Sequence, residues 1–284
     1  MGIDIENLTN QLKKYLNSKQ SVEMAFVFGS QVSGTKNIES DLDIAVYFKP
    51  KTEKLDYEEE IFFDEENEIW NELEKISKCK VDFVVLNRAP SLLAFSIIKN
   101  GKPITIKNRF RYWDFFLKIS SEAFDFREFV DDFLAIKSRS QSLSREDKDR
   151  IIKLKEFLKT EINDYDDYKD IDFNVYKDDR KKRRSIERWV ENIINCSIDI
   201  AKILLASNKK QLPDTYVDTL RLLSILPAFD EEKAKKMASF VKLRNIIAHE
   251  YLDLRFSQIQ DFLKQSRVIY TYLSDYVDNF LKFK

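Results

Sequence analysis

The sequence of 284 residues contains one histidine, two cysteines, four glycines and five prolines. Cys79 and Cys196 lie far apart and have no metal-ligand spacing, which argues against a disulfide scaffold and suits a reducing cytoplasm. The shortage of glycine and proline predicts long helices joined by few tight turns. Since histidine is the side chain that changes protonation near neutral pH, chemistry that needs an imidazole must take place at His249.

Net charge and long apolar runs are also missing. Lys and Arg number 48 against 49 Asp and Glu, so no global electrostatic field attracts nucleic acid, and an RNA site must be a local patch. No run approaches the roughly 18 apolar residues of a membrane span, and the N-terminus lacks an apolar signal core, so we expect a cytoplasmic protein without membrane contact. Hydrophobic residues make up 43% of the chain, enough for the cores of two domains.

Acidic residues on two predicted strands form the first candidate site. Residues 24–28 predict a buried strand that ends at Gly29-Ser30, and residues 40–48 predict a second strand carrying Asp41 and Asp43. Side chains alternate along a strand, so these two carboxylates share a face, where their repulsion is costly unless a cation lies between them. Oxygen ligands at this spacing suit Mg²⁺, which also binds nucleotide phosphates.

A third carboxylate is expected at the same place. Residues 81–86 predict a strand in which Asp82 stands among apolar side chains. Burial of an unpaired carboxylate costs several kcal/mol, so we expect Asp82 to point at the cation site.

The remaining pattern divides the chain into an α+β part and an all-α part. Helices are predicted near residues 8–16, 57–78, 90–99 and 110–136, with a short strand at 103–107. The polar, serine-rich stretch 137–145 predicts a linker, which gives domains at 1–136 and 146–284.

Five helices are expected beyond the linker. They cover about 145–161, 179–207, a stretch opening at Leu212-Pro213-Asp214, 230–251 and the C-terminus, and their short connections predict an antiparallel bundle.

Gly29-Ser30, followed by Asp41-x-Asp43 and then Asp82 on a later strand, resembles the nucleotidyltransferases related to DNA polymerase β. More narrowly, residues 1–135 resemble the minimal nucleotidyltransferase (MNT) branch. The resemblance implies a small mixed sheet with helices. It also implies that the Gly-Ser loop binds the phosphates of ATP, that the three carboxylates bind two Mg²⁺ ions, and that Asp82 activates the acceptor hydroxyl.

The helical part carries the motif Arg244-x4-His249-x-Tyr251. Together with the pattern of residues 186–191, this motif resembles the HEPN (higher eukaryotes and prokaryotes nucleotide-binding) domain over residues 145–284. HEPN toxins are typically metal-independent ribonucleases that use the Arg and His of the motif and need no cofactor. In two-gene pairs the MNT partner transfers AMP to the tyrosine. The resemblance therefore implies a fused, type VII-like toxin–antitoxin chain that modifies Tyr251 and thereby silences an endoribonuclease acting on RNA, such as tRNA or mRNA.

Metal-free cleavage of RNA needs both a base and an acid. A chain with one histidine supplies both only if two chains meet or another group substitutes, so we expect a homodimer through the helical domain with paired His249 residues. On an ideal helix Asn245 shares the face of His249, whereas Arg244 lies about 140° away and must reach round, or act across the dimer, to stabilise the phosphorane.

One concentrated basic patch stands at the start of the long helix. Such a run is usually a solvated face, but it is also the local cluster best suited to RNA phosphates. It consists of Arg180, Lys181, Lys182, Arg183 and Arg184.

Three other interpretations stay open. An antibiotic nucleotidyltransferase with a helical substrate domain would modify an aminoglycoside hydroxyl, and the motif residues would be bystanders. A non-catalytic scaffold would bind ATP without releasing pyrophosphate. Finally, His249 could simply cap carbonyl groups at the end of a helix. The sequence does not identify the RNA target, the number of AMP units, the nucleotide donor preference, the resting modification state, or whether modification occurs within one chain.

Overall fold

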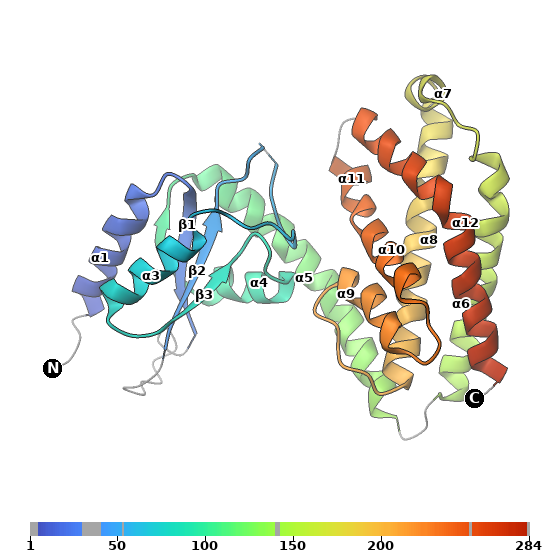
Figure 1. Cartoon of the computed structure of the whole chain (residues 1–284), viewed down its shortest axis with the longest axis horizontal. Coiled ribbons are helices and arrows are strands. Elements are labelled where there is room, and N and C mark those ends of the chain that lie inside the picture. Colours follow the sequence, from blue (N-terminus) through green and yellow to red (C-terminus); the bar gives the residue numbers. More distant parts are fainter. Residues whose placement is uncertain (1–4, 30–40, 53, 140–142, 250–251, 283–284) are drawn as a thin grey trace. The chain divides into compact units, whose positions relative to one another are not determined.

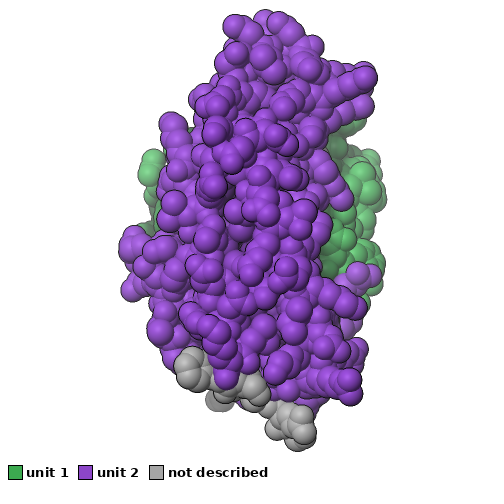
Figure 2. All heavy atoms as spheres, turned by 90° about the vertical axis from the view of Figure 1, so that its right-hand side faces the viewer, with its two compact units in different colours: residues 1–127 green, residues 128–284 purple. Residues whose placement is uncertain are grey.

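The computed structural model describes residues 5–29, 41–52, 54–139, 143–249 and 252–282. These residues form two compact units, which divide between residues 127 and 128 and are coloured separately in Figure 2. Each unit is treated by itself below.

A four-stranded sheet forms the centre of the N-terminal unit (Figure 1). Its strands are β1 (Val22–Phe28), β2 (Leu42–Phe48), β3 (Val81–Val85) and β4 (Lys102–Ile106), in the order β3-β2-β1-β4. β1 runs antiparallel to both β2 and β4, whereas β2 and β3 are parallel. The predicted strands and the predicted small mixed sheet are confirmed.

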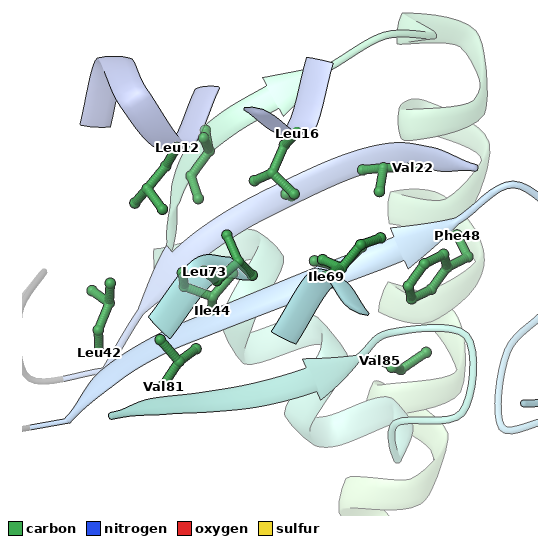
Figure 3. Close-up of a cluster of buried hydrophobic side chains, with 13 residues drawn as sticks. Leu12, Leu16, Val22, Leu42, Ile44, Phe48, Ile69, Leu73, Val81 and Val85 are labelled. Carbon is green, nitrogen blue, oxygen red and sulfur yellow. The ribbon is translucent and has the colours of Figure 1, made fainter. Parts of the chain in front are cut away.

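Helices cover both faces of this sheet. On one face, α1 (Ile5–Ser18) and α3 (Glu66–Ser77) contribute Leu12, Leu16, Ile69 and Leu73 to a core with alternate residues of the strands (Figure 3). On the other face, α4 (Ser91–Asn100) and the first part of α5 (Arg109–Ser138) pack on the intervening strand residues. The alternation that sorts apolar side chains between these two cores also decides which face carries the acidic residues.

The turn after β3 is fixed by a fully buried asparagine. The backbone N–H of Phe48 donates to Asn87 Oδ1 at 2.8 Å, and Asn87 Nδ2 donates to the Phe48 carbonyl at 2.9 Å. One side chain thus satisfies both backbone groups at the end of β2.

The acidic stretch predicted as one helix from residue 57 is helical only from Glu66 onward. Upstream, Glu58 has a positive φ of 50°, and its carboxylate accepts the N–H of Ser91 at the start of α4 at 2.8 Å. The N–H of Glu59 donates to the Asn87 carbonyl at 3.2 Å. These bonds hold the segment against the loop after β3 and divert it from the helical path.

α5 is continuous from Arg109 to Ser138 and belongs to both units. Phe115 and Ile119 lie in the core of the first unit, whereas Phe129, Phe133 and Ile136 are buried in the second. Contacts therefore place the division of the chain inside this helix, and the domain limits 1–136 and 146–284 stay a prediction.

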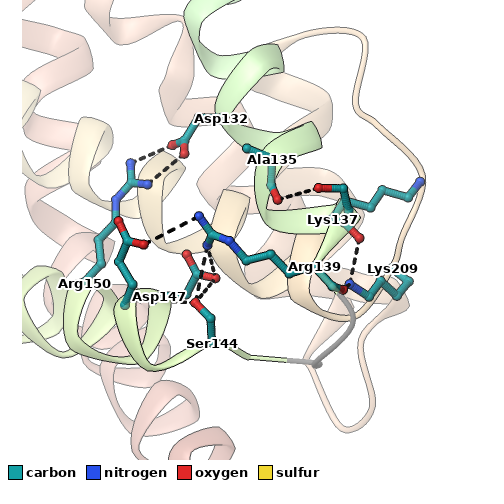
Figure 4. Close-up of polar contacts among 10 residues, drawn as sticks. Asp132, Ala135, Lys137, Arg139, Ser144, Asp147, Arg150 and Lys209 are labelled. Carbon is teal, nitrogen blue, oxygen red and sulfur yellow. Dashed lines mark hydrogen bonds and ion pairs between the residues drawn. The ribbon is translucent and has the colours of Figure 1, made fainter.

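A charge network ties the end of α5 to the bundle (Figure 4). Arg150 donates to both carboxylate oxygens of Asp132, at 2.9 and 2.7 Å, and the Nζ of the buried Lys202 lies 2.8 Å from Asp132. Burial alone would raise the pKa of Asp132, but the hydrogen bonds from Arg150 and Lys202 outweigh burial and lower that pKa to about 2. Arg139, just after the helix, pairs with Asp147.

The C-terminal unit is helical within its described residues, which confirms the predicted all-α class. After α5 its α-helices are α6 (Arg145–Asn163), α7 (Phe173–Asp178), α8 (Arg180–Ser207), α9 (Tyr216–Arg221), α10 (Glu231–Val241), α11 (Leu243–His249) and α12 (Leu252–Lys282). Short 3-10 helices cover Asp164–Asp167 and Leu222–Ile225.

Two helix boundaries differ from the sequence prediction. The helix expected to open at residues 212–214 begins only at Tyr216, because the Thr215 side chain accepts the N–H of Asp218 at 3.0 Å and caps the helix there. The helix expected over 230–251 is interrupted at Lys242, which separates α10 from α11. Across the part of the chain that the structure describes, no helix is long and apolar enough to cross a membrane.

Candidate functional sites

The carboxylates of the N-terminal unit lie where three strands meet. Asp43 is the register partner of Phe28 on β1 and of Asp82 on β3. Asp43 lies on the same side of the sheet as Ala45 and Tyr47, which belong to the core under α4 and α5. Asp41 and Asp82 follow the same alternation. The structure therefore brings the acidic residues to one end of one face, as the sequence pattern requires.

Gly29 places the backbone directly against this group. Its φ is +75°, a conformation that favours glycine, and a Cβ atom at this position would collide with the carboxylate of Asp43. The backbone at Gly29 therefore lies in close contact with the Asp43 side chain. Ser30, the other predicted nucleotide-binding residue, lies outside the described residues.

The environments of the three carboxylates differ. Asp43 is half-buried, and burial, followed by the negative charges of Asp82 and Asp41, raises its pKa. Asp41 and Asp82 are exposed. Asp82 belongs to β3, an edge strand of the sheet, and its side chain reaches solvent at no large desolvation cost.

These residues fit a divalent cation in their chemistry. Three carboxylates supply only hard oxygen ligands, and the repulsion that raises the pKa of Asp43 is the kind that a cation relieves. Among the described residues, no three His, Cys, Asp or Glu side chains already form a closed cation cage. Binding would therefore require the side chains of Asp41, Asp43 and Asp82 to turn toward one ion.

The second candidate site is the short helix α11. Leu243 and Ile247 are buried and anchor the helix in the bundle, and Arg244 beside them is half-buried. The guanidinium carbon of Arg244 lies 5.2 Å from the centre of the Tyr216 ring. Tyr251 lies outside the described residues, and the side chains of Asn245 and His249 are not described either, so their predicted roles stay predictions.

The basic cluster lies at the start of α8, as predicted, but two of its members already make contacts within the protein. Arg183 donates to the carbonyls of Tyr176 and Lys177, at 3.2 and 2.7 Å, and Lys182 lies over the ring of Tyr168. Arg180, Lys181 and Arg184 are exposed. A positive cluster at a helix N-terminus acts against the helix dipole, which the Asp179 cap partly offsets. RNA binding by this cluster stays a prediction.

Two features of the C-terminal unit were not foreseen from the sequence. Glu187 accepts the Tyr176 hydroxyl at 2.7 Å and faces Arg255 at 3.4 Å, and burial together with the Glu187 charge raises the pKa of Tyr176. The other feature is the cation–π contact between Arg244 and Tyr216. Both join residues far apart in sequence, so no local spacing reveals them.

Comparison with known proteins assigns both units to families. Residues 10–110 match the family described as Polymerase beta, Nucleotidyltransferase, and residues 148–278 match the family described as Ribonuclease HepT-like. The chain therefore joins a nucleotidyltransferase domain to a HepT-like domain. Among curated proteins no match was found.

Solved structures that resemble part of the chain are toxin–antitoxin proteins. They include the toxin–antitoxin MntA-HepT, with 20% sequence identity and a TM-score of 0.34 over 46% of this chain and 94% of that one. A toxin–antitoxin with AMP-PNP is 22% identical, with a TM-score of 0.34 over 46% of this chain and 94% of its own. A tri-AMPylated Shewanella oneidensis HEPN toxin in complex with MNT antitoxin is 20% identical, with a TM-score of 0.34 over 46% and 93%.

Proposed function

We propose that this chain is a single-chain toxin–antitoxin protein. Its nucleotidyltransferase domain transfers AMP from ATP to Tyr251, and this modification silences an endoribonuclease in the HepT-like domain. The observation that supports the proposal most is the presence of both families on one chain, with Asp43 and Asp82 side by side on adjacent strands of the first domain.

In the transfer step, Asp41, Asp43 and Asp82 would hold Mg²⁺, and Gly29 and Ser30 would hold the phosphates of ATP. The cation neutralises the triphosphate when it is bound. The Tyr251 oxygen forms a bond to the α-phosphorus, the bond to the β-phosphate oxygen breaks, and pyrophosphate leaves. Asp82 accepts the proton of the hydroxyl, a role that suits an exposed carboxylate which a protein side chain can approach.

In the cleavage step, His249 would deprotonate the ribose 2′-hydroxyl, and His249 of a second copy would protonate the leaving oxygen. This assignment requires a homodimer because the chain has one histidine. Arg244 would stabilise the charged phosphorane, and Asn245 would help to orient it on the face of His249. The HepT-like domain needs no metal for these steps.

AMP on Tyr251 would place a phosphate and a bulky base two residues from His249. The added negative charge repels the RNA backbone and the base blocks its approach, so the modified form should not cleave.

The test is the intact mass of the purified full-length chain before and after incubation with Mg²⁺ and ATP. We expect gains of whole AMP units in the native protein and none in Tyr251→Phe or Asp43→Asn. The same preparation, shown to start unmodified, is then assayed for RNA cleavage with and without prior incubation. An unmodified chain that gains no AMP refutes self-modification.

The same assay separates the alternatives. Transfer of AMP to a kanamycin-like aminoglycoside by the native chain and by Tyr251→Phe alike would show a small-molecule nucleotidyltransferase. ATP binding without release of pyrophosphate would show a scaffold.

A further inference from the structure

The side chain of Arg244 rests on an aromatic ring from another helix. Its guanidinium carbon lies 5.2 Å from the centre of the Tyr216 ring, and both side chains are half-buried. Tyr216 is the first residue of α9, and Arg244 is the second residue of α11. A guanidinium over an aromatic face at this distance is an attractive cation–π contact.

The ring of Tyr216 is itself held in place. Thr215 caps α9: its Oγ1 accepts the N–H of Asp218 at 3.0 Å, and its hydroxyl donates to the Asp218 carboxylate at 2.9 Å. The Tyr216 ring also makes an edge contact with Phe129 of α5, with centroids 5.5 Å apart and planes at 88°. Since Phe129 is buried, it is a fixed neighbour of the tyrosine ring.

A cation–π contact suits an arginine that must bind a phosphate. A guanidinium group carries five N–H donors, and an aromatic ring leaves most of them, together with the positive charge, for a ligand. A salt bridge would orient the side chain too, but a carboxylate would occupy the donors and neutralise the charge. The contact with Tyr216 therefore restrains Arg244 without neutralising its charge.

We infer that Tyr216 is a positioning residue that holds Arg244 in the orientation required for RNA phosphate. The inference rests on the ribonuclease activity proposed above and names a residue outside the Arg-x4-His-x-Tyr motif.

The first experiment detects the contact without reference to activity. The side-chain protons of Arg244, assigned by NMR through their loss in Arg244→Lys, should show an upfield ring-current shift in the full-length chain. That shift should persist in Tyr216→Phe and disappear in Tyr216→Leu. Arg244 protons without a ring-current shift in the native chain would overturn the inference before any variant is compared.

The second experiment measures RNA cleavage by the full-length chain, shown by intact mass to be unmodified. Tyr216→Leu should lower kcat about tenfold with little change in KM, the effect expected for loss of one partly buried cation–π contact. Tyr216→Phe keeps the ring and should stay within about threefold of the native rate. In an Arg244→Ala background, Tyr216→Leu should have no further effect.

Two results would contradict the inference. One is an equal loss of kcat in Tyr216→Phe and Tyr216→Leu, and the other is an undiminished effect of Tyr216→Leu on kcat in the Arg244→Ala background. Thermal unfolding of each variant shows whether a lower cleavage rate results from unfolding of that variant. Where it does, the ring-current shift of the native chain decides whether the inference holds. If the native, unmodified chain cleaves no RNA, the ribonuclease proposal fails, and the inference is judged on the ring-current shift alone.

Discussion

The C-terminal unit should fold only if it keeps the end of α5. The comparison is between two excised fragments, 128–284 and 143–284. Both retain Ser144, whose side chain caps α6, so they differ in the α5 segment alone. The family match to the HepT-like domain begins at residue 148 and gives no sign of this requirement.

The expected cost follows from three side chains. Phe129, Phe133 and Ile136 are exposed by 3%, 0% and 1%, and burial of each such side chain contributes about 2 kcal/mol. Their loss removes about 6 kcal/mol, against a total of about 5–15 kcal/mol for a domain. The shorter fragment also loses Asp132, the partner of Arg150 and Lys202. We therefore expect fragment 143–284 to show no cooperative folding.

Urea unfolding measures the difference. Trp189 is the sole tryptophan of either fragment and is buried, so its fluorescence reports loss of the bundle core. Fragment 128–284 should unfold in one cooperative transition, and Phe133→Ala in that fragment should lower its free energy of unfolding by about 4 kcal/mol. Unfolding free energies of the two fragments within about 1 kcal/mol of each other would refute the reasoning.

Three further predictions concern charges and the glycine at the carboxylate site. The pKa of Asp132 is lowered from 3.8 to about 2, so the ionised carboxylate stabilises the folded state by about 2 kcal/mol above pH 4, and this stabilisation is lost as the pH falls from about 4 to 2. Urea unfolding measured at a series of pH values should show this loss in the native chain and not in Asp132→Asn. Gly29→Ala should abolish AMP transfer, measured by intact mass, because its Cβ would meet the Asp43 carboxylate and its φ is positive. Asp43→Asn should abolish transfer as well, yet leave the thermal unfolding temperature at neutral pH unchanged or raised. The reason is that burial and the neighbouring negative charges disfavour the ionised carboxylate and raise its pKa. A lowered unfolding temperature would contradict this account.

The strands and the grouping of the acidic residues follow from the sequence because alternation is a local property. Alternation along one strand places Asp41 and Asp43 on one face, and the register of β2 and β3 makes Asp43 and Asp82 neighbours. The exposure of Asp82 does not follow, because it depends on the order of strands in the sheet. Nothing within β3 itself indicates that it lies at the edge.

The helical part shows the same division. The starts of α8 near Asp179 and of α10 near Asp230 were expected, and the side chains of both residues cap their helices. No glycine or proline near Lys242 predicts the interruption between α10 and α11. The support of Arg244 by Tyr216 arises from packing between helices, and periodicity within one helix carries no information about it.

The shared helix α5 has a consequence for regulation in the cell. Two partners encoded by different genes dissociate when they are diluted, and their ratio follows their relative synthesis and breakdown. Here the two domains are made in equal number, and modification within one chain would proceed at a rate that does not depend on protein concentration. A break in the chain after α5 would not free the bundle, because Phe129, Phe133 and Ile136 remain in its core. Under the function proposed above, release of the nuclease would then depend on removal of AMP and not on loss of the first domain.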